Sequence, residues 1–140
     1  MKDYKKGKIY KIVCNITNDI YIGSTIQTLH IRLLKHKSDA KRNKRIASSD
    51  IINRGDYMIE LIENYPCYSK LELHTRERYY IENTKCINFA IPTQNMKEWR
   101  KKNEEKLILQ VKDYYNKNIL SIADYQKKYN QQNKKKIALQ

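Results

Sequence analysis

Cysteine is scarce in this sequence of 140 residues, and its spacing is uninformative for metal or disulfide chemistry. The three cysteines, Cys14, Cys67 and Cys86, are odd in number and far apart, and no Cys-x-x-Cys or Cys/His cluster accompanies them. This pattern excludes a disulfide framework and a zinc finger. It fits a reducing compartment, so we expect an intracellular protein.

Long apolar runs are also missing. The N-terminus is basic, but it lacks the apolar run of about 7–15 residues that a secretory signal needs. Nor is there a stretch of about 20 apolar residues that could form a membrane-spanning helix. We therefore expect a soluble protein without a membrane partner.

Acidic residues are too few to balance the basic ones. Lys and Arg number 29 against 15 Asp and Glu, which gives a net charge of +14 and a pI of about 9.7. Residues 1–92 and residues 93–140 each carry a net charge of +7, although the second segment is about half as long. Such a charge is typical of proteins that bind polyanions, most often nucleic acid, although it also fits a merely solvated surface.

Glycine and proline are rare, so the few turn signals divide the chain clearly. Alternating β-branched and aromatic residues predict strands over 8–14, 20–24 and 57–63. Helices are predicted over about 29–44, capped by Thr28, and from the capping box that begins at Ser69 to about Asn83, with a short helical turn near 48–52. The expected fold is α/β (α+β): a small three-stranded antiparallel sheet flanked by helices, in a domain of residues 1–92.

The first two strands each carry a tyrosine. If Ile12 pairs with Tyr21, then Tyr10 and Tyr21 lie on one face of the hairpin, one diagonal step apart. A register shift of one residue would separate them. Gly23 follows, at the point where we expect the second strand to stop and the backbone to turn or to approach a ligand closely.

The first long helix carries two polar side chains one turn apart. Arg32 and His36 are spaced i, i+4, and we expect them to share a face. That face is expected to differ from the inward one, to which Leu29, Leu33 and Ala40 belong.

A carboxylate interrupts the apolar stripe of the later helix. Glu77 lies among apolar residues of the same face, namely Leu73, Tyr80 and Ile81. A buried carboxylate is unfavourable unless it is paired or coordinates a cation. Glu77 therefore either binds a metal or forms a buried salt bridge, for example with Arg76 or Arg78 of its own helix.

Residues 93–140 contain no glycine and no proline, and they carry a repeat of 15 residues. Three positions repeat together: Trp99, Tyr114 and Tyr129; Asn103, Asn118 and Asn133; Leu107, Ile122 and Ile137. Fifteen residues exceed four helical turns by about 60°, so the repeat predicts a right-handed supercoil or helical pieces with bends between them. A DNA-binding basic helix, a self-associating coiled coil and a partly disordered arm are all compatible with it.

These elements together resemble the GIY-YIG nuclease family over residues 7–92. "KIY" (8–10) and "YIGST" (21–25) resemble the signature that names the family, with Lys8 in place of its first glycine. "RLLKH" (32–36) resembles its Arg-x-x-x-His, "ERYYI" (77–81) resembles its Glu-x-x-x-Ile, and "CINFA" places Asn88 at its late asparagine. Some members carry a lysine where this sequence has Ser24. Five elements in the family's order make the resemblance specific.

The resemblance implies a DNA endonuclease that depends on Mg²⁺ (or Mn²⁺) and leaves 3′-hydroxyl and 5′-phosphate ends. It implies Tyr10 or Tyr21 as the group that activates water, assisted by His36, and Glu77 as the metal ligand. Gly23, Ser24 and Asn88 are the candidate substrate-binding residues. The residue chemistry agrees, because the planar fork of Arg32 suits a phosphate and Glu77 offers a hard oxygen ligand.

Two other interpretations remain open. The first domain could be a nuclease-derived module that binds nucleic acid without cutting it. Alternatively, residues 93–140 could be an assembly device, so that the protein would act chiefly as a scaffold. Asn88 could also serve only as a turn or cap residue.

Overall fold

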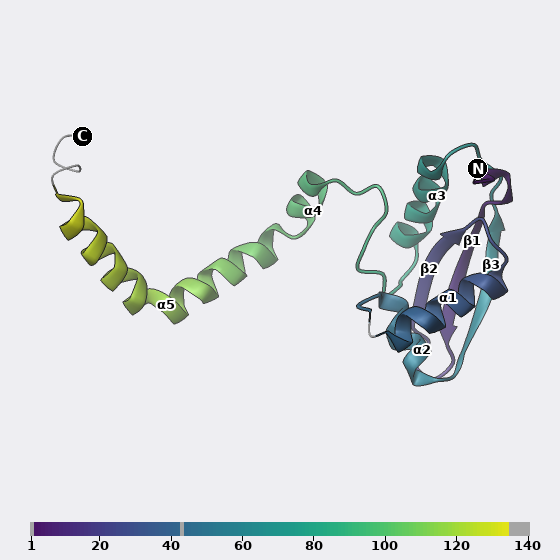
Figure 1. The fold of residues 1–140 in the computed structure, drawn as a ribbon, viewed down its shortest axis with the longest axis horizontal. Coiled ribbons are helices and arrows are strands. Elements are labelled where there is room, and N and C mark those ends of the chain that lie inside the picture. Colours follow the sequence, from purple (N-terminus) through teal and green to yellow (C-terminus); the bar gives the residue numbers. More distant parts are fainter. Residues whose placement is uncertain (1, 43, 135–140) are drawn as a thin grey trace. The chain divides into compact units, whose positions relative to one another are not determined.

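The computed structural model describes residues 2–42 and 44–134, and the chain divides into two units, Met1–Gln94 and Asn95–Gln140. The first unit contains three strands and three α-helices (Figure 1). In chain order its elements are the 3-10 helix η1 (Tyr4–Lys6), β1 (Lys8–Cys14), β2 (Ile20–Thr25), α1 (Leu29–Lys41), α2 (Ala47–Arg54), β3 (Tyr57–Asn64) and α3 (Lys70–Asn83).

The three strands form one antiparallel sheet in the order β2-β1-β3, which confirms the predicted fold class. Ile12 pairs with Tyr21 and Tyr10 pairs with Gly23, so Tyr10 and Tyr21 share one face of the sheet as predicted. Strand β2 continues to Thr25, so Gly23 lies inside the strand and not at its end.

Each face of the sheet has its own hydrophobic core. On one face, Ile9 and Ile22 pack with Leu73 and Ile81 of α3. On the other, buried residues of β1 pack with Ile51 of α2 and with partly buried leucines of α1. Strand β1 therefore lies between two helical layers, which explains why Ile9, Tyr10, Ile12 and Cys14 are fully buried (Figure 1).

Side-chain caps fix the starts of the two long helices of this unit. The hydroxyl of Thr28 accepts a hydrogen bond from the backbone N–H of Ile31, and that of Ser69 accepts one from Glu72. Helix α1 ends at Lys41, three residues earlier than predicted. At the end of α2, Gly55 adopts φ 91°, a left-handed conformation that glycine tolerates best.

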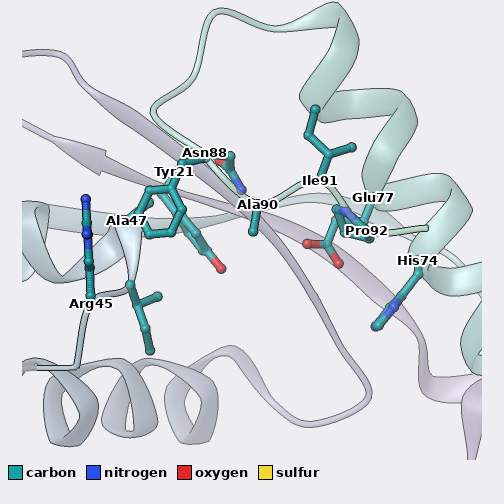
Figure 2. A pocket seen from close by; sticks show the side chains of 11 residues that line it. Tyr21, Arg45, Ala47, His74, Glu77, Asn88, Ala90, Ile91 and Pro92 are labelled. Atoms are coloured by element: carbon teal, nitrogen blue, oxygen red, sulfur yellow. The ribbon is translucent and has the colours of Figure 1, made fainter. Parts of the chain in front are cut away.

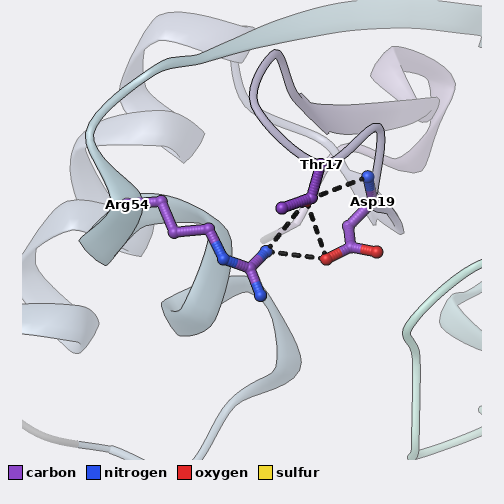
Figure 3. A network of polar contacts seen from close by, with 3 residues as sticks. All are labelled: Thr17, Asp19 and Arg54. Atoms are coloured by element: carbon purple, nitrogen blue, oxygen red, sulfur yellow. Dashed lines mark hydrogen bonds and ion pairs between the residues drawn. The ribbon is translucent and has the colours of Figure 1, made fainter.

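The loop between β1 and β2 is attached to the end of α2 (Figure 3). One guanidinium nitrogen of Arg54 donates to Oδ2 of Asp19 at 2.7 Å and to the hydroxyl of Thr17 at 3.2 Å. The hydroxyl of Thr17 also donates to Oδ2 of Asp19 at 2.9 Å. This bond is the largest cause that lowers the pKa of the Asp19 carboxyl, and the bond from Arg54 is the next. The network joins two segments 35 residues apart in the chain and so restrains the hairpin that carries both tyrosines.

The second unit consists of α4 (Met96–Lys102) and α5 (Glu104–Gln132), and neither helix contains a buried residue. Asn103 separates the two helices without any glycine or proline, and Asn133 ends α5. Each repeat asparagine donates from its side chain to the carbonyl of the repeat aromatic four residues earlier: Asn103 to Trp99, Asn118 to Tyr114 and Asn133 to Tyr129. The third aliphatic position of the repeat, Ile137, lies outside the described residues.

No helix of the described chain is long and apolar enough to cross a membrane.

Candidate active site

A chain of hydrogen bonds centred on Tyr10 joins the sheet to α1 and α2. The phenol oxygen of Tyr10 lies 2.8 Å from Nε2 of His36 and accepts a hydrogen bond of 2.8 Å from Nε of Arg32. Nδ1 of His36 lies 2.7 Å from the hydroxyl of Ser48. Tyr10, His36 and Ser48 are all almost fully buried, so this network holds the Arg32 side chain in one orientation.

Arg32 and His36 do not lie on the separate face of α1 that the sequence analysis predicts for them. Both side chains point inward, together with Ala40, and not onto a separate face of α1. The physical reason is the helical period, since positions 32, 36 and 40 are each about one turn apart and must lie in one row. The inward face of α1 is therefore partly polar.

Burial sets the protonation state of this network. It lowers the pKa of His36 to about 4, and the nearby Arg32 charge acts in the same direction. It also raises the pKa of Tyr10, although the Arg32 charge opposes this. At neutral pH the imidazole is uncharged and the phenol is protonated. With the Nδ1 proton directed to Ser48, Nε2 accepts the proton of Tyr10, while Arg32 supplies the positive charge.

Glu77 is buried on α3, only 9% exposed, as the apolar stripe predicts. Its Oε2 accepts a hydrogen bond of 2.5 Å from the hydroxyl of Ser24. Burial raises the pKa of the Glu77 carboxyl, while the Ser24 hydrogen bond and the charge of Arg32 oppose the rise. The arginines beside it in the helix pair with other carboxylates, Arg76 with Glu63 and Arg78 with Glu82.

Glu77 and Tyr21 line the same pocket, of about 350 Å³ (Figure 2). Tyr21 comes from β2, and its ring lies edge to face against the ring of His36, with the two ring centroids 5.3 Å apart. Burial raises the pKa of the Tyr21 phenol, and Glu77 contributes to the rise. The pocket thus brings a tyrosine of the sheet and the carboxylate of α3 to one cavity, beside the Arg32 network.

Gly23 allows Tyr10 to lie where it does. A Cβ atom on Gly23 would overlap the ring of Tyr10, with its Cζ only 2.6 Å away. Because Tyr10 pairs directly with this glycine across the sheet, a side chain here would displace the phenol from His36 and Arg32.

Asn88 is held against the free edge of β2. Its side chain accepts from the backbone N–H of Ile22 at 2.9 Å and donates to the carbonyl of the same residue at 2.7 Å. The backbone N–H of Ile87 donates to the carbonyl of Ile20. These bonds pair the edge strand much as another strand would, and they place Asn88 in the wall of the pocket.

Two further residues, which the sequence analysis did not select as site residues, line the pocket. His74 lies one turn before Glu77 and lines the same cavity, and burial lowers the pKa of its imidazole. Arg45, an exposed cation just before α2, lines it as well (Figure 2). For His74 the i, i+3 spacing from Glu77 was an available signal. Arg45 stands in a basic segment, and only the tertiary structure distinguishes it from its neighbours.

The polar side chains that line the pocket suit a single cation that takes few of its ligands from the protein. Among residues 2–42 and 44–134, no cluster of three or more His, Cys, Asp or Glu side chains is placed to hold a metal ion. Magnesium, however, is often held by one or two carboxylates, with waters and substrate phosphates completing its shell. Glu77, at the wall of an open pocket, is compatible with that mode of binding.

A family model described as "GIY-YIG catalytic domain" matches residues 6–88. Two proteins of Invertebrate iridescent virus 6 match over 87 residues, or 60% of this chain. "Putative MSV199 domain-containing protein 146R" is 34% identical and matched over 36% of its length; "Uncharacterized protein 019R" is 31% identical and matched over 31%. The chain thus spans about a third of the length of these relatives.

Two solved structures share the fold of the first unit. The catalytic domain of the intron endonuclease I-TevI superposes with a TM-score of 0.53 at 24% identity, covering 64% of this chain and 99% of that domain. A second structure, titled as the catalytic domain of the homing endonuclease I-TevI, gives 0.50 at 25% identity, covering 61% and 99%.

Proposed function

The chain belongs to the GIY-YIG catalytic domain family, and from this premise we propose that it is an endonuclease that hydrolyses phosphodiester bonds in DNA. One observation carries the proposal. The buried network of Tyr10, His36 and Arg32 lies next to a pocket that Tyr21 and Glu77 line. Hydrolysis of a phosphodiester needs an activated water and a fixed positive charge near the phosphate, and these residues offer both.

Arg32 is proposed to bind the phosphate. Its Nε donates to the phenol of Tyr10, which fixes the plane of the guanidinium next to the sheet. A fixed, permanently charged donor group matches the oxygens of a phosphate, on which negative charge grows during the reaction. In this scheme Tyr10 and His36 serve the reaction by orienting Arg32.

Tyr21 is proposed to contact the attacking water. Of the two tyrosines it is the one that lines the pocket, whereas Tyr10 is fully buried. Because the pKa of its phenol is raised, Tyr21 stays protonated at neutral pH, so it would accept a proton from water only when a nearby cation favours the phenolate. The charge of Arg32 acts in that direction.

Nucleases of this family generally use divalent metal ions, and we propose Mg²⁺ or Mn²⁺ held by Glu77. When bound, such an ion polarises the phosphate and lowers the pKa of a coordinated water. Burial and the Ser24 hydrogen bond hold the carboxylate in one rotamer at the pocket wall. The DNA backbone is proposed to pass along β2, near Gly23 and Ser24. Asn88 supports that strand and lies within reach of the substrate in the pocket wall.

The roles proposed for the two segments of the chain follow from their basic composition. Residues 1–92 would form the nuclease domain, and residues 93–140 a region that binds DNA or mediates assembly. A reducing, intracellular setting is proposed from the number and spacing of the cysteines in the sequence.

The test is incubation of the full chain with supercoiled plasmid, with Mg²⁺ or with EDTA. Nicked or linear product with Mg²⁺ alone is expected, and end analysis should find 5′-phosphates. Binding to the plasmid without any cleavage in Mg²⁺ or Mn²⁺ would favour the other interpretation, a domain that binds nucleic acid but does not cut it.

A further inference from the structure

Helix α5 carries a stripe of large side chains, none of them buried within the described chain. The exposed fraction is 68% for Val111, 65% for Tyr114, 70% for Tyr125 and 47% for Tyr129, and Leu107, Asn118 and Ile122 are half-buried. The full stripe consists of Leu107, Val111, Tyr114, Asn118, Ile122, Tyr125 and Tyr129. At about 100° per residue these positions fall within about 80° of the helix circumference, so they lie on one side of α5, and we call this stripe the seam.

The seam is symmetric about Asn118. Its other members stand 4, 7 and 11 residues before and after that asparagine. Each equidistant pair also combines one tyrosine with one aliphatic residue: Tyr114 with Ile122, Tyr125 with Val111, and Tyr129 with Leu107. A two-fold axis through Asn118 would bring the two members of each such pair together from two chains.

From this symmetry we infer that α5 pairs with α5 of a second copy of the chain, antiparallel, about Asn118. Every apolar layer then contains one tyrosine and one aliphatic side chain, so the two helices stay at a constant distance. A parallel pair in register would instead stack tyrosine on tyrosine in three layers and leave the aliphatic layers thin. The 11-residue spacing within the seam, as between Leu107 and Asn118, predicts a slight right-handed coiling of the pair.

Asn118 has the hydrogen-bonding capacity that this position requires. Its Nδ2 donates to the carbonyl of Tyr114 at 2.8 Å, which uses one of two N–H donors. Within the described residues the second donor and Oδ1 are left for an identical amide across the two-fold axis. A single asparagine in an apolar seam fixes the register and the number of helices in an assembly.

The charge of α5 favours a second copy over DNA as the occupant. The helix has five lysines and four acidic residues, so it is almost neutral, although the protein is strongly basic. The positive charge of the second unit lies instead in α4, which has four basic residues and one acidic residue, and in the lysines at 134–136. In the proposed dimer, Lys117 lies near the two-fold axis and so approaches Lys117 of the second copy. Asp113 of the same chain pairs with Lys117 at 2.7 Å and compensates the lysine charge.

The seam is also large enough for a stable dimer. A tyrosine buries about 150–250 Å² when it is covered, and each helix contributes three tyrosines and three aliphatic side chains. That approaches the roughly 800 Å² per partner of a standard interface. Tyr115 and Ile119, exposed by 51% and 47%, flank the seam beside Asn118 and extend the apolar surface. Since each chain has one catalytic unit, the dimer would have two.

The decisive experiment measures the mass of the full chain in solution at micromolar concentration, by sedimentation equilibrium. The wild type is expected at twice the 16.9 kDa of one chain. Ile122→Asp, in the seam, is expected to weaken the dimer by about 100-fold or more, because it buries two carboxylates. Ala123→Asp, the next residue on the outward face, is the matched control and should leave the dimer intact.

Orientation is tested by disulfide trapping between differently tagged chains. In chains whose three native cysteines are replaced by serine, a mixture of Leu107→Cys and Tyr129→Cys chains should form the mixed dimer, while Leu107→Cys alone should not link to itself. Self-linking of Leu107→Cys would overturn the antiparallel arrangement. A monomeric wild type would overturn the dimer itself. If Ile122→Asp then lost DNA affinity more than Ala123→Asp, the seam would be a DNA-binding surface instead.

Discussion

The two units of this chain use apolar residues in opposite ways. In Met1–Gln94, aliphatic and aromatic side chains of three strands and three helices bury one another. In Asn95–Gln140, the same residue types recur with helical spacing, yet α4 and α5 contain no buried residue. An amphipathic pattern therefore predicts a helix in both units, but only a partner decides whether its apolar face becomes core or interface.

The difference extends to polar groups. In the first unit Tyr10, His36 and Glu77 are taken out of water and held by specific hydrogen bonds, so their pKa values move away from ordinary ones. In the second unit, ion pairs such as Lys117 with Asp113 are exposed and contribute little to stability. Substitutions in the first unit should therefore change rates or folding, and substitutions in the second should change affinity or assembly.

The largest expected effect is that of Glu77→Ala. Loss of the carboxylate that lines the pocket should reduce cleavage by about 1,000-fold, as loss of a key electrostatic group does. Folding should be little affected, since a buried charge is itself unfavourable. Plasmid cleavage and thermal unfolding measure the two quantities. Glu82→Ala, an exposed position of the same helix, is the control, and equal activity of both variants would remove Glu77 from the site.

Arg32→Lys should be nearly as damaging as Arg32→Ala, with cleavage reduced by about 100-fold. Lysine keeps the charge but cannot donate to Tyr10 from Nε while directing further planar donors at a phosphate. Single-turnover rates provide the measurement. Lys35→Ala removes a charge from the exposed side of α1 and should be neutral. Near-normal cleavage by the lysine variant would show that the reaction needs only the positive charge of Arg32 and not its planar donor group.

Deleting residues 93–140 should affect binding and not chemistry. The segment carries 12 Lys and Arg against five acidic residues. Each phosphate contact contributes about −0.9 to the slope of log K against log salt, so the deletion should flatten that slope by several units and weaken binding on the order of 100-fold. Fluorescence anisotropy over a salt series measures both. The double variant Lys97→Gln and Lys101→Gln removes two charges of α4 but keeps α5, so it separates the effect of charge from that of assembly. A salt slope that the deletion leaves unchanged would show that residues 93–140 do not contact DNA.

The smallest expected effect is a pH dependence of stability due to His36. Its pKa is about 4 in the folded chain and near 6.5 when unfolded, so the unfolded state binds the extra proton between those values. Stability should therefore fall by about 2 kcal/mol from pH 7 to pH 5 through this group. Urea unfolding at the two pH values measures it. His36→Gln should lose this part of the dependence, and an identical pH profile would contradict the assignment.

Local patterns predicted the frame of the first unit well. Alternation gave β1 and its partner strands, and the hydroxyls of Thr28 and Ser69 marked where helices begin, because each of these signals acts within a few residues. The placement of Tyr10 and Tyr21 on one face of the sheet followed from the period of a strand. The apolar stripe around Glu77 also anticipated its burial.

Tertiary partners were beyond local patterns. Ser48 could not be identified as the partner of His36, nor Ser24 as that of Glu77, because each contact joins residues far apart in the chain. Asn88 presented a similar problem, since only the fold shows that its amide is bonded to the edge of β2. In the second unit the repeat predicted a right-handed supercoil or helical pieces with bends, but not that Asn103 would separate two helices while Asn118 lies within one.

The most direct test compares the single-turnover cleavage rate of residues 1–94 with that of the full chain, on one plasmid in Mg²⁺ at saturating protein. All proposed catalytic residues lie in the first unit. The account predicts rates equal within a few-fold, with the fragment needing more protein to saturate. A fragment that folds, binds DNA and fails to cut would show that the second unit contributes to the chemistry and would contradict the account.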